Sequence, residues 1–318
     1  MTLRRSISEA NYDSFLDPAL PGRPAQIRIK LKVTLIPLDP STAWARARHV
    51  VPAAGTPLGV PMPPAHLAHN LAAAKKGNVL DANGTAVACR SWLDTEWSEF
   101  TNRFKHSVEH SWNNQMIFLP TESGVNGDEL SDADYLQFIA NPRMPAHAEG
   151  ALEIELQPPN TIGHALIEVA HLANPGADFR QRMSRISDES VLFTTSGFTY
   201  RRPRGITGKT GQIAAAHEIG HWLRDPNARL FEHIDRTFAV TLPKARQDEA
   251  QYGRTLGRFY SLMGGGSVVG DYEAAPWITR LRRQTPMKLG WTHVHKLHFQ
   301  WTLDDIPERQ KQLQQKRA

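Results

Sequence analysis

The residues of this sequence best suited to chemistry are His217, Glu218 and His221, which form the pattern H-E-x-x-H. Residues four apart on an α-helix lie on one face, so both imidazoles can point at a single ion. Zn²⁺ is the usual occupant of such a site, bound by imidazole nitrogens at about 2.0–2.1 Å. Glu218 lies to one side of that face, where it can reach a zinc-activated water without being a ligand. The pattern therefore predicts a hydrolase with one catalytic zinc ion and Glu218 as general base.

Apolar residues surround this motif, so we expect the helix that contains it to be buried. They are Ile213, Ala214, Ala215, Ala216, Ile219, Gly220, Trp222 and Leu223. Two buried imidazoles and a buried carboxylate are costly unless a partner satisfies them, and a metal ion is such a partner. Residues 207–210 offer start signals and Pro226 stops the pattern, which predicts a helix of roughly 12–15 residues. The alternative is a core helix whose histidines bond only backbone carbonyls, and it leaves Glu218 without a role.

A second histidine pair, His106 and His110, forms the inverted pattern H-x-x-E-H with Glu109. It lies in a strongly amphipathic stretch, residues 94–113, which predicts a helix. The apolar stripe of that helix consists of Trp97, Phe100, Phe104, Val108 and Ser111. His106 and His110 project on the opposite, polar side, where solvated histidines need no metal. We therefore interpret this pair as a surface feature and not as a second metal site.

The H-E-x-x-H motif gives the chain a resemblance to the zincin metallopeptidases, and within them it is closest to the metzincins. Metzincins extend the motif to H-E-x-x-H-x-x-G-x-x-H and add a methionine-containing turn beneath the metal. Residues 260–264, Tyr-Ser-Leu-Met-Gly, are similar to this Met-turn. Arg224 stands where the glycine belongs and Asn227 where the third histidine belongs, so the usual third ligand is missing. An ordinary glycine loop is the alternative interpretation of the turn, because two more glycines follow it.

The third zinc ligand is left open by this departure, although a catalytic zinc takes three protein ligands and one water. His233 is our candidate, because it supplies a histidine after an apparent insertion. Asp225 and Asp235 are carboxylate alternatives. Glu249 is a further alternative in a helix-like run, and it would resemble the gluzincins, which take a glutamate from a following helix.

The expected fold class is α+β. Alternating apolar and polar residues over 27–35 predict a half-buried strand, and further strands are expected at 116–119, 152–156, 165–172 and 191–200. The order of strand, long helix, several strands and metal-binding helix resembles the N-terminal lobe of a zincin. That resemblance implies a twisted, mostly antiparallel or mixed sheet packed on two helices, followed by a mainly helical or irregular C-terminal lobe. It also makes residues 191–195 a candidate edge strand for pairing with an extended substrate.

We expect three parts along the chain. Residues 1–24 form an irregular N-terminal arm, and residues 25–292 form a zincin-like metallopeptidase domain with lobes 25–223 and 224–292. Residues 293–318 form a C-terminal strand and a charged tail.

Composition limits the partners and the compartment. The chain has 318 residues, 40% of them hydrophobic, which is enough for a sizeable core. It has no apolar run long enough for a transmembrane helix and no apolar segment typical of a secretory signal after Arg4 and Arg5. The single cysteine, Cys89, fits a reducing compartment, so we expect a cytoplasmic protein or one exported by a signal-independent route. The net charge of +5 is scattered along the chain, and we expect no binding to nucleic acid.

The expected activity is that of a zinc-dependent metalloendopeptidase with a protein or peptide substrate. Tyr260 and Tyr272 are candidates for the tyrosine that often assists the reaction in zincins. One alternative is a binding protein that keeps a zincin fold without turnover, and another is a toxin-like effector peptidase delivered into another cell. Neither the substrate nor the oligomeric state follows from the sequence.

Overall fold

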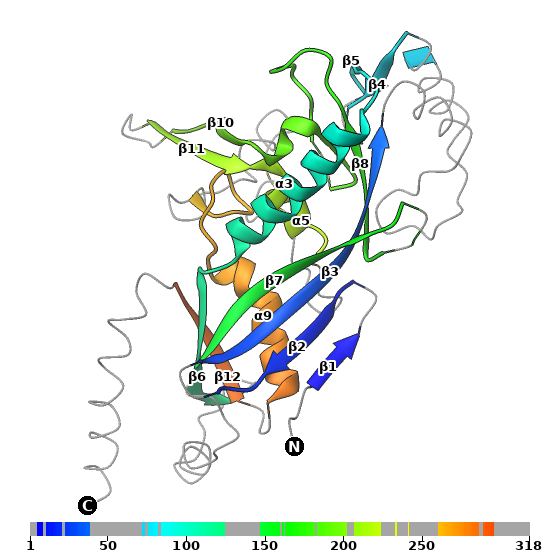
Figure 1. The fold of residues 1–318 in the computed structure, drawn as a ribbon. Coiled ribbons are helices and arrows are strands. Elements are labelled where there is room, and N and C mark those ends of the chain that lie inside the picture. Colours follow the sequence, from blue (N-terminus) through cyan, green and yellow to red (C-terminus); the bar gives the residue numbers. More distant parts are fainter. Residues whose placement is uncertain are drawn as a thin grey trace, which may run out of the picture.

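The structure is a computed structural model, and it describes most of the sheet, its helices and the surroundings of the H-E-x-x-H motif. The described residues are 5–8, 11–20, 23–38, 72–73, 76–81, 84–124, 147–159, 161, 163–181, 183–201, 207–223, 233, 241, 260–285 and 289–295. The protein has a mixed α+β fold with a curled, mixed sheet (Figure 1). No helix in these ranges is long and apolar enough to cross a membrane.

Within the described residues the main sheet has eight strands, with β3 (Ala25–Leu38) at its centre. Antiparallel pairing adds β2 (Asp13–Asp17) and then β1 (Arg5–Ser8) on one side of β3. On the other side β7 (Ala148–Gln157) pairs with β3 in parallel, followed by antiparallel β6 (Met116–Gly124) and β12 (Leu289–His295). The far end of β3 pairs in parallel with β8 (Ala165–Ala170), which pairs with β9 (Arg185–Ser187). The expected strands are present, and most are longer than predicted.

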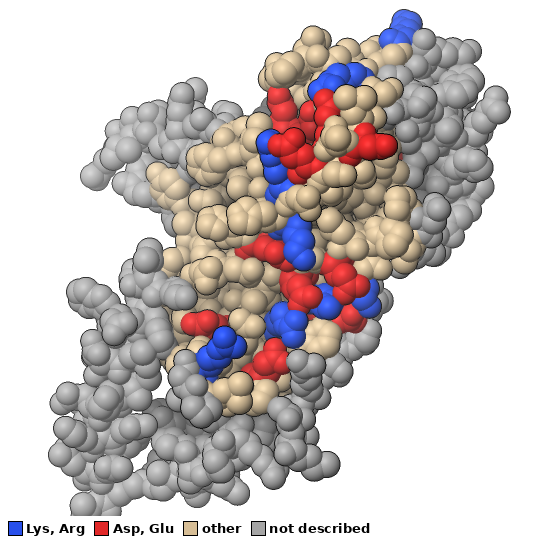
Figure 2. Space-filling view, in the orientation of Figure 1, with Lys and Arg blue, Asp and Glu red and all other residues tan. Residues whose placement is uncertain are grey.

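The side chains of β3 point alternately to two faces of the sheet, one packed against the core and one bearing charged residues. From Ala25 to Leu35 every second side chain is buried, as a half-buried strand requires. The intervening Arg28 and Lys30 bridge to acidic residues of neighbouring strands, including Lys30 Nζ to Glu155 Oε2 at 3.0 Å. Figure 2 shows basic and acidic side chains interspersed on the face in view. These half-exposed pairs add little stability individually, but they keep the outer face free of a patch of one sign.

Helix α3 (Asp94–Trp112) packs on the sheet and confirms the predicted amphipathic helix to within one residue. Glu96 accepts the Leu93 N–H at its start, 3.1 Å from Oε2. Its expected apolar stripe is buried at Phe100, Phe104 and Val108, and Trp112 extends it. Helix α9 (Asp271–Gln284) joins the same core, and the rings of Trp112 and Trp277 stack with centroids 5.6 Å apart.

The smaller elements complete the described structure. Strands β4 (Asn78–Leu80) and β5 (Ala86–Ala88) form one hairpin. The 3₁₀ helix η1 (Asp188–Val191) leads into a second hairpin, made of β10 (Phe193–Arg201) and β11 (Thr207–Ile213). Strand β11 runs directly into α5 (Ala214–Gly220), the helix of the H-E-x-x-H motif.

Three sequence predictions need correction. The N-terminal arm is not irregular, because β1 and β2 extend the main sheet and Tyr12 is fully buried beside them. The C-terminal strand begins at Leu289 and belongs to the same sheet. In the candidate edge strand, Val191 ends η1 and strand structure begins only at Phe193. The predicted charged tail lies outside the described residues.

Candidate metal centre

The H-E-x-x-H motif lies on a helix that is shorter than predicted. Helix α5 has seven residues, and the expected start signals at 207–210 belong to strand β11 instead. The reason is that threonine and glycine are poor helix formers, whereas β11 gains backbone pairing with β10 from Thr207 to Ile213. The helix ends at Gly220, with His221 as its C-cap, so it also stops earlier than the end predicted from Pro226.

The apolar flanks of the motif are buried only in part, because Ile213, Ala214 and Trp222 are half-buried. Ala215, Ala216, Ile219 and Leu223 have no exposed surface. His217 is 3% exposed and Glu218 8%, whereas His221 is only half-buried. The motif therefore has a buried side toward the core and an accessible side at His221.

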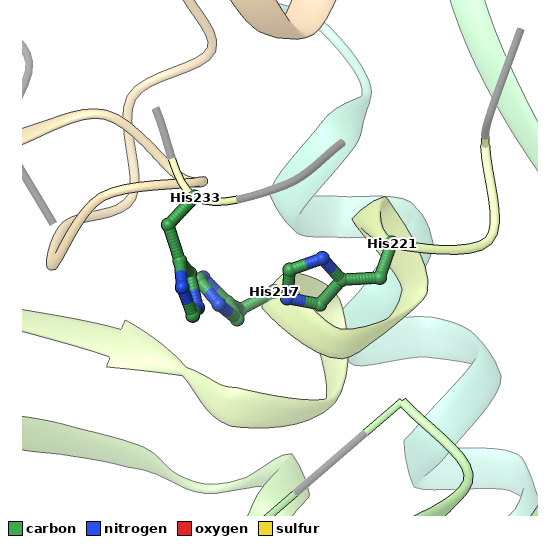
Figure 3. Close-up of side chains that lie close together, drawn as sticks. All are labelled: His217, His221 and His233. Atoms are coloured by element: carbon green, nitrogen blue, oxygen red, sulfur yellow. The ribbon is translucent and has the colours of Figure 1, made fainter. Parts of the chain in front are cut away.

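His233 lies beside the two motif histidines, although it is distant from them in sequence. The three ring centroids are 5.0 Å apart for His217 and His221, 5.2 Å for His217 and His233, and 5.1 Å for His221 and His233. Figure 3 shows the three imidazoles turned toward one another, two from the end of α5 and one from the segment of His233. One nitrogen from each ring lies within 4.8 Å of the others.

This donor set fits zinc. Three imidazole nitrogens are the ligand set of one class of catalytic zinc, and tetrahedral ligands at about 2.0–2.1 Å from the ion lie roughly 3.3 Å apart. The nitrogens of the three rings lie within 4.8 Å of one another, so one ion could contact all three. In the part of the chain that the structure describes, no other group of three His, Cys, Asp or Glu side chains is arranged in this way.

The protonation of His217 suits a metal ligand. Its Nδ1 lies 2.8 Å from the backbone carbonyl oxygen of Leu262, and a carbonyl can only accept. Nδ1 therefore bears the proton, and the lone pair of the neutral ring is on Nε2. Burial is the main cause that lowers the pKa of His217 well below its usual value, and the neighbouring His221 and His233 lower it further. The ring is thus neutral at physiological pH, as a zinc ligand must be.

The loop that contains Leu262 lies directly against α5. Leu262 and Met263 are fully buried in the common core. A Cβ at Gly220 would be 2.2 Å from Sδ of Met263 and 3.1 Å from the Trp112 ring, so only glycine allows this approach. Trp112 also donates from Nε1 to the Ala216 carbonyl at 3.1 Å. The segment predicted to be a Met-turn thus places its methionine against the helix of the H-E-x-x-H motif.

Several other candidates are placed elsewhere or fall outside the described residues. The alternative ligands Asp225, Asp235 and Glu249 lie outside the described ranges. His106 and His110 are exposed on α3 with their rings 6.0 Å apart. Glu109 accepts the backbone N–H of Ile154 at 2.8 Å, so its role is to bind the edge of β7. The interpretation of this inverted motif as a surface feature agrees with that geometry.

The structure also reveals two contributors that the sequence analysis missed. The Leu262 carbonyl orients His217, and a backbone group of a loop leaves no signal in the residue types. Glu273 of α9 is fully buried and accepts the Met263 N–H at 2.9 Å. Its spacing from Gly270 follows a helix-capping pattern, with glutamate at the third helical position, and that pattern could have identified it.

Comparisons of the chain with protein-family models, with curated proteins and with solved structures gave no match.

Proposed function

We propose that the protein is a zinc-dependent metallopeptidase of the zincin class, similar to the metzincins. The observation that supports this most strongly is the position of His233 beside His217 and His221. The motif accounts for the first two residues, but nothing in a helical spacing requires a third histidine from a distant segment to join them. Glu218, which follows His217 on α5, supplies the carboxylate that a hydrolase of this class needs.

In this proposal His217, His221 and His233 hold the zinc ion. When bound, zinc supplies Lewis-acid chemistry, because it lowers the pKa of water to about 7 and stabilises negative charge on a carbonyl oxygen. Glu218 removes a proton from the attacking water, whose oxygen forms a bond to the carbonyl carbon of the substrate. Glu218 then delivers that proton to the leaving nitrogen as the C–N bond breaks. The burial of Glu218 keeps bulk water from competing for this proton.

An extended peptide can be oriented by the hairpin that leads into the site. In the described ranges β10 pairs only with β11, so its other edge presents backbone N–H and C=O groups. An added strand would satisfy these groups. Phe193, at the start of β10, is 67% exposed and offers an apolar surface to a substrate side chain.

The test uses purified protein, zinc analysis and a mixed peptide library with and without a chelator. Glu218→Ala should retain zinc and lose hydrolysis, because the carboxylate is a base and not a ligand. His217→Ala, His221→Ala and His233→Ala should each lose both. Hydrolysis by zinc-loaded Glu218→Ala at the wild-type rate would refute the general-base role. Zinc binding by the wild type without any peptide cleavage would favour a binding protein that keeps the site without turnover.

A further inference from the structure

Glu273 is a buried carboxylate that the proposed reaction does not use. It lies in the first turn of α9 and has no exposed surface. One oxygen, Oε1, accepts the Met263 N–H at 2.9 Å, and the other, Oε2, accepts the Gly270 N–H at 3.0 Å. The hydroxyl of Ser261 is a third hydrogen-bond partner of this carboxyl group. All three partners belong to the loop that passes beneath α5.

The same loop sets the orientation of His217. The carbonyl that accepts from His217 Nδ1 belongs to Leu262, and the N–H that donates to Glu273 belongs to the next residue, Met263. Leu262 O and Met263 N are the two ends of one peptide unit, which is planar. Fixing the N–H with Glu273 therefore fixes the direction of the carbonyl as well. A rigid link thus runs from the carboxylate of α9 to the imidazole of α5.

The link also explains why this position contains a carboxylate although it is buried. Burial raises the pKa of Glu273, and its hydrogen bonds to backbone N–H groups oppose that rise. A glutamate offers an acceptor oxygen to each of two N–H groups, whereas a glutamine offers only one. The positive end of the α9 dipole further favours an acidic group in the first turn. This position therefore favours glutamate, because both of its oxygens can accept hydrogen bonds from the loop.

We infer that Glu273 is a positioning residue for the metal centre: through the Leu262–Met263 peptide it holds His217 with Nδ1 protonated and Nε2 directed at the ion. This inference rests on the zinc site proposed above. Glu273 touches neither the metal nor a substrate, and its effect is on the geometry and tautomer of one ligand. Without it the peptide can rotate, the carbonyl turns away, and the proton of His217 can move to Nε2, where it blocks metal binding.

The experiment compares Glu273→Gln and Glu273→Ala with the wild type and with a matched control, Gln284→Met. Gln284 is also buried on α9, at its other end, and donates to Ser14 Oγ at 2.7 Å. Its substitution removes a buried hydrogen bond of the same helix without touching the loop. Zinc affinity is measured by competition with a chelator on the folded fraction, and the tautomer of His217 by ¹⁵N NMR of the metal-free protein, assigned with His217→Ala.

We expect zinc to bind about tenfold more weakly in Glu273→Gln and still more weakly in Glu273→Ala, in line with other outer-shell partners. The ¹⁵N shifts of His217 should change from the Nδ1–H form to a mixture of tautomers. Gln284→Met should lose stability but keep both wild-type values. Wild-type zinc affinity and an unchanged tautomer in Glu273→Gln would overturn the positioning role alone. Should Glu273→Ala not fold, Glu273→Gln decides the question. A wild type that binds no zinc would refute the metal centre and the positioning role together.

Discussion

The contact between α5 and the Met263 loop can be tested by placing one methyl group in it. In Gly220→Ala the new Cβ would lie 2.2 Å from Met263 Sδ and 3.1 Å from the Trp112 ring. Ordinary contacts begin at 3.4 Å, so the sulfur would have to retreat by more than 1 Å. Both neighbours are enclosed in the core, where there is little room to move. Met263 is fully buried with its N–H bound to Glu273, and Trp112 is hydrogen-bonded to Ala216.

The cost of Gly220→Ala follows from this crowding. Inserting a methyl group into a packed core costs about 1–3 kcal/mol. Alanine is favoured over glycine in a helix by up to ~1 kcal/mol, but Gly220 is the last helical residue, so little of that gain applies. We expect a net loss of about 1–2 kcal/mol in the free energy of unfolding. Because α5 must shift to relieve the clash and His221 follows directly, zinc affinity should also fall, by about tenfold.

The assay is urea unfolding of the metal-free protein, together with chelator competition for zinc. A second background isolates the clash: Met263→Val has no atom at the δ position, so Gly220→Ala should cost about 1 kcal/mol less there. Wild-type stability and zinc affinity in Gly220→Ala would refute the close approach of the loop to the helix. An equal cost in both backgrounds would show that Met263 is not the neighbour responsible.

Three further outcomes are expected. His164 accepts the Lys32 N–H at 3.0 Å through Nδ1, and burial is the main reason that its pKa is lowered. The unfolded chain therefore protonates His164 at a higher pH than the folded protein does, so the free energy of unfolding falls as the pH drops below about 6.5. His164→Asn accepts the same hydrogen bond without titrating, so it should flatten the pH dependence of Tm. Parallel curves for wild type and variant would contradict this expectation. The double variant His106→Ala/His110→Ala should keep its zinc content and peptidase rate and change stability by less than about 0.5 kcal/mol, as exposed residues do; a loss of zinc would reveal a second site. A chelator should lower the Tm of the wild type, because zinc at a hundredfold excess over Kd stabilises the folded protein by about 2.7 kcal/mol. The Tm of His217→Ala should not change on chelation, and an equal decrease in both proteins would place the metal elsewhere.

The parts of the fold that the sequence predicts best are those with a clear period. Helix α3 follows from the spacing of Phe100, Phe104 and Val108, and β3 follows from strict alternation, since both patterns record which face is buried. The register and partners of the strands do not follow, because they depend on contacts between distant segments. For the same reason the sequence predicts an irregular arm where β1 and β2 lie, because these short strands are stabilised only by pairing with each other and with β3.

The candidate site divides in a similar way. The spacing of His217 and His221 predicts their shared face, because four residues make about one helical turn. From the sequence, His233 is one of several candidate ligands. Its position beside His217 and His221 depends on the tertiary structure, which no local sequence pattern predicts. The predicted helix start is wrong, because the threonines before Ala214 can begin a helix or belong to a strand, and pairing with β10 decides between the two. The backbone carbonyl of Leu262 could not be inferred from any residue type.

The most direct test of the metal centre is the first coordination shell of zinc, measured by X-ray absorption spectroscopy on protein loaded with one zinc ion. We predict three imidazole nitrogens and one further light ligand at about 2.0–2.1 Å, with one imidazole fewer in His233→Ala. A shell with fewer imidazoles in the wild type, or one that His233→Ala leaves unchanged, would contradict the assignment of His217, His221 and His233 as the zinc ligands.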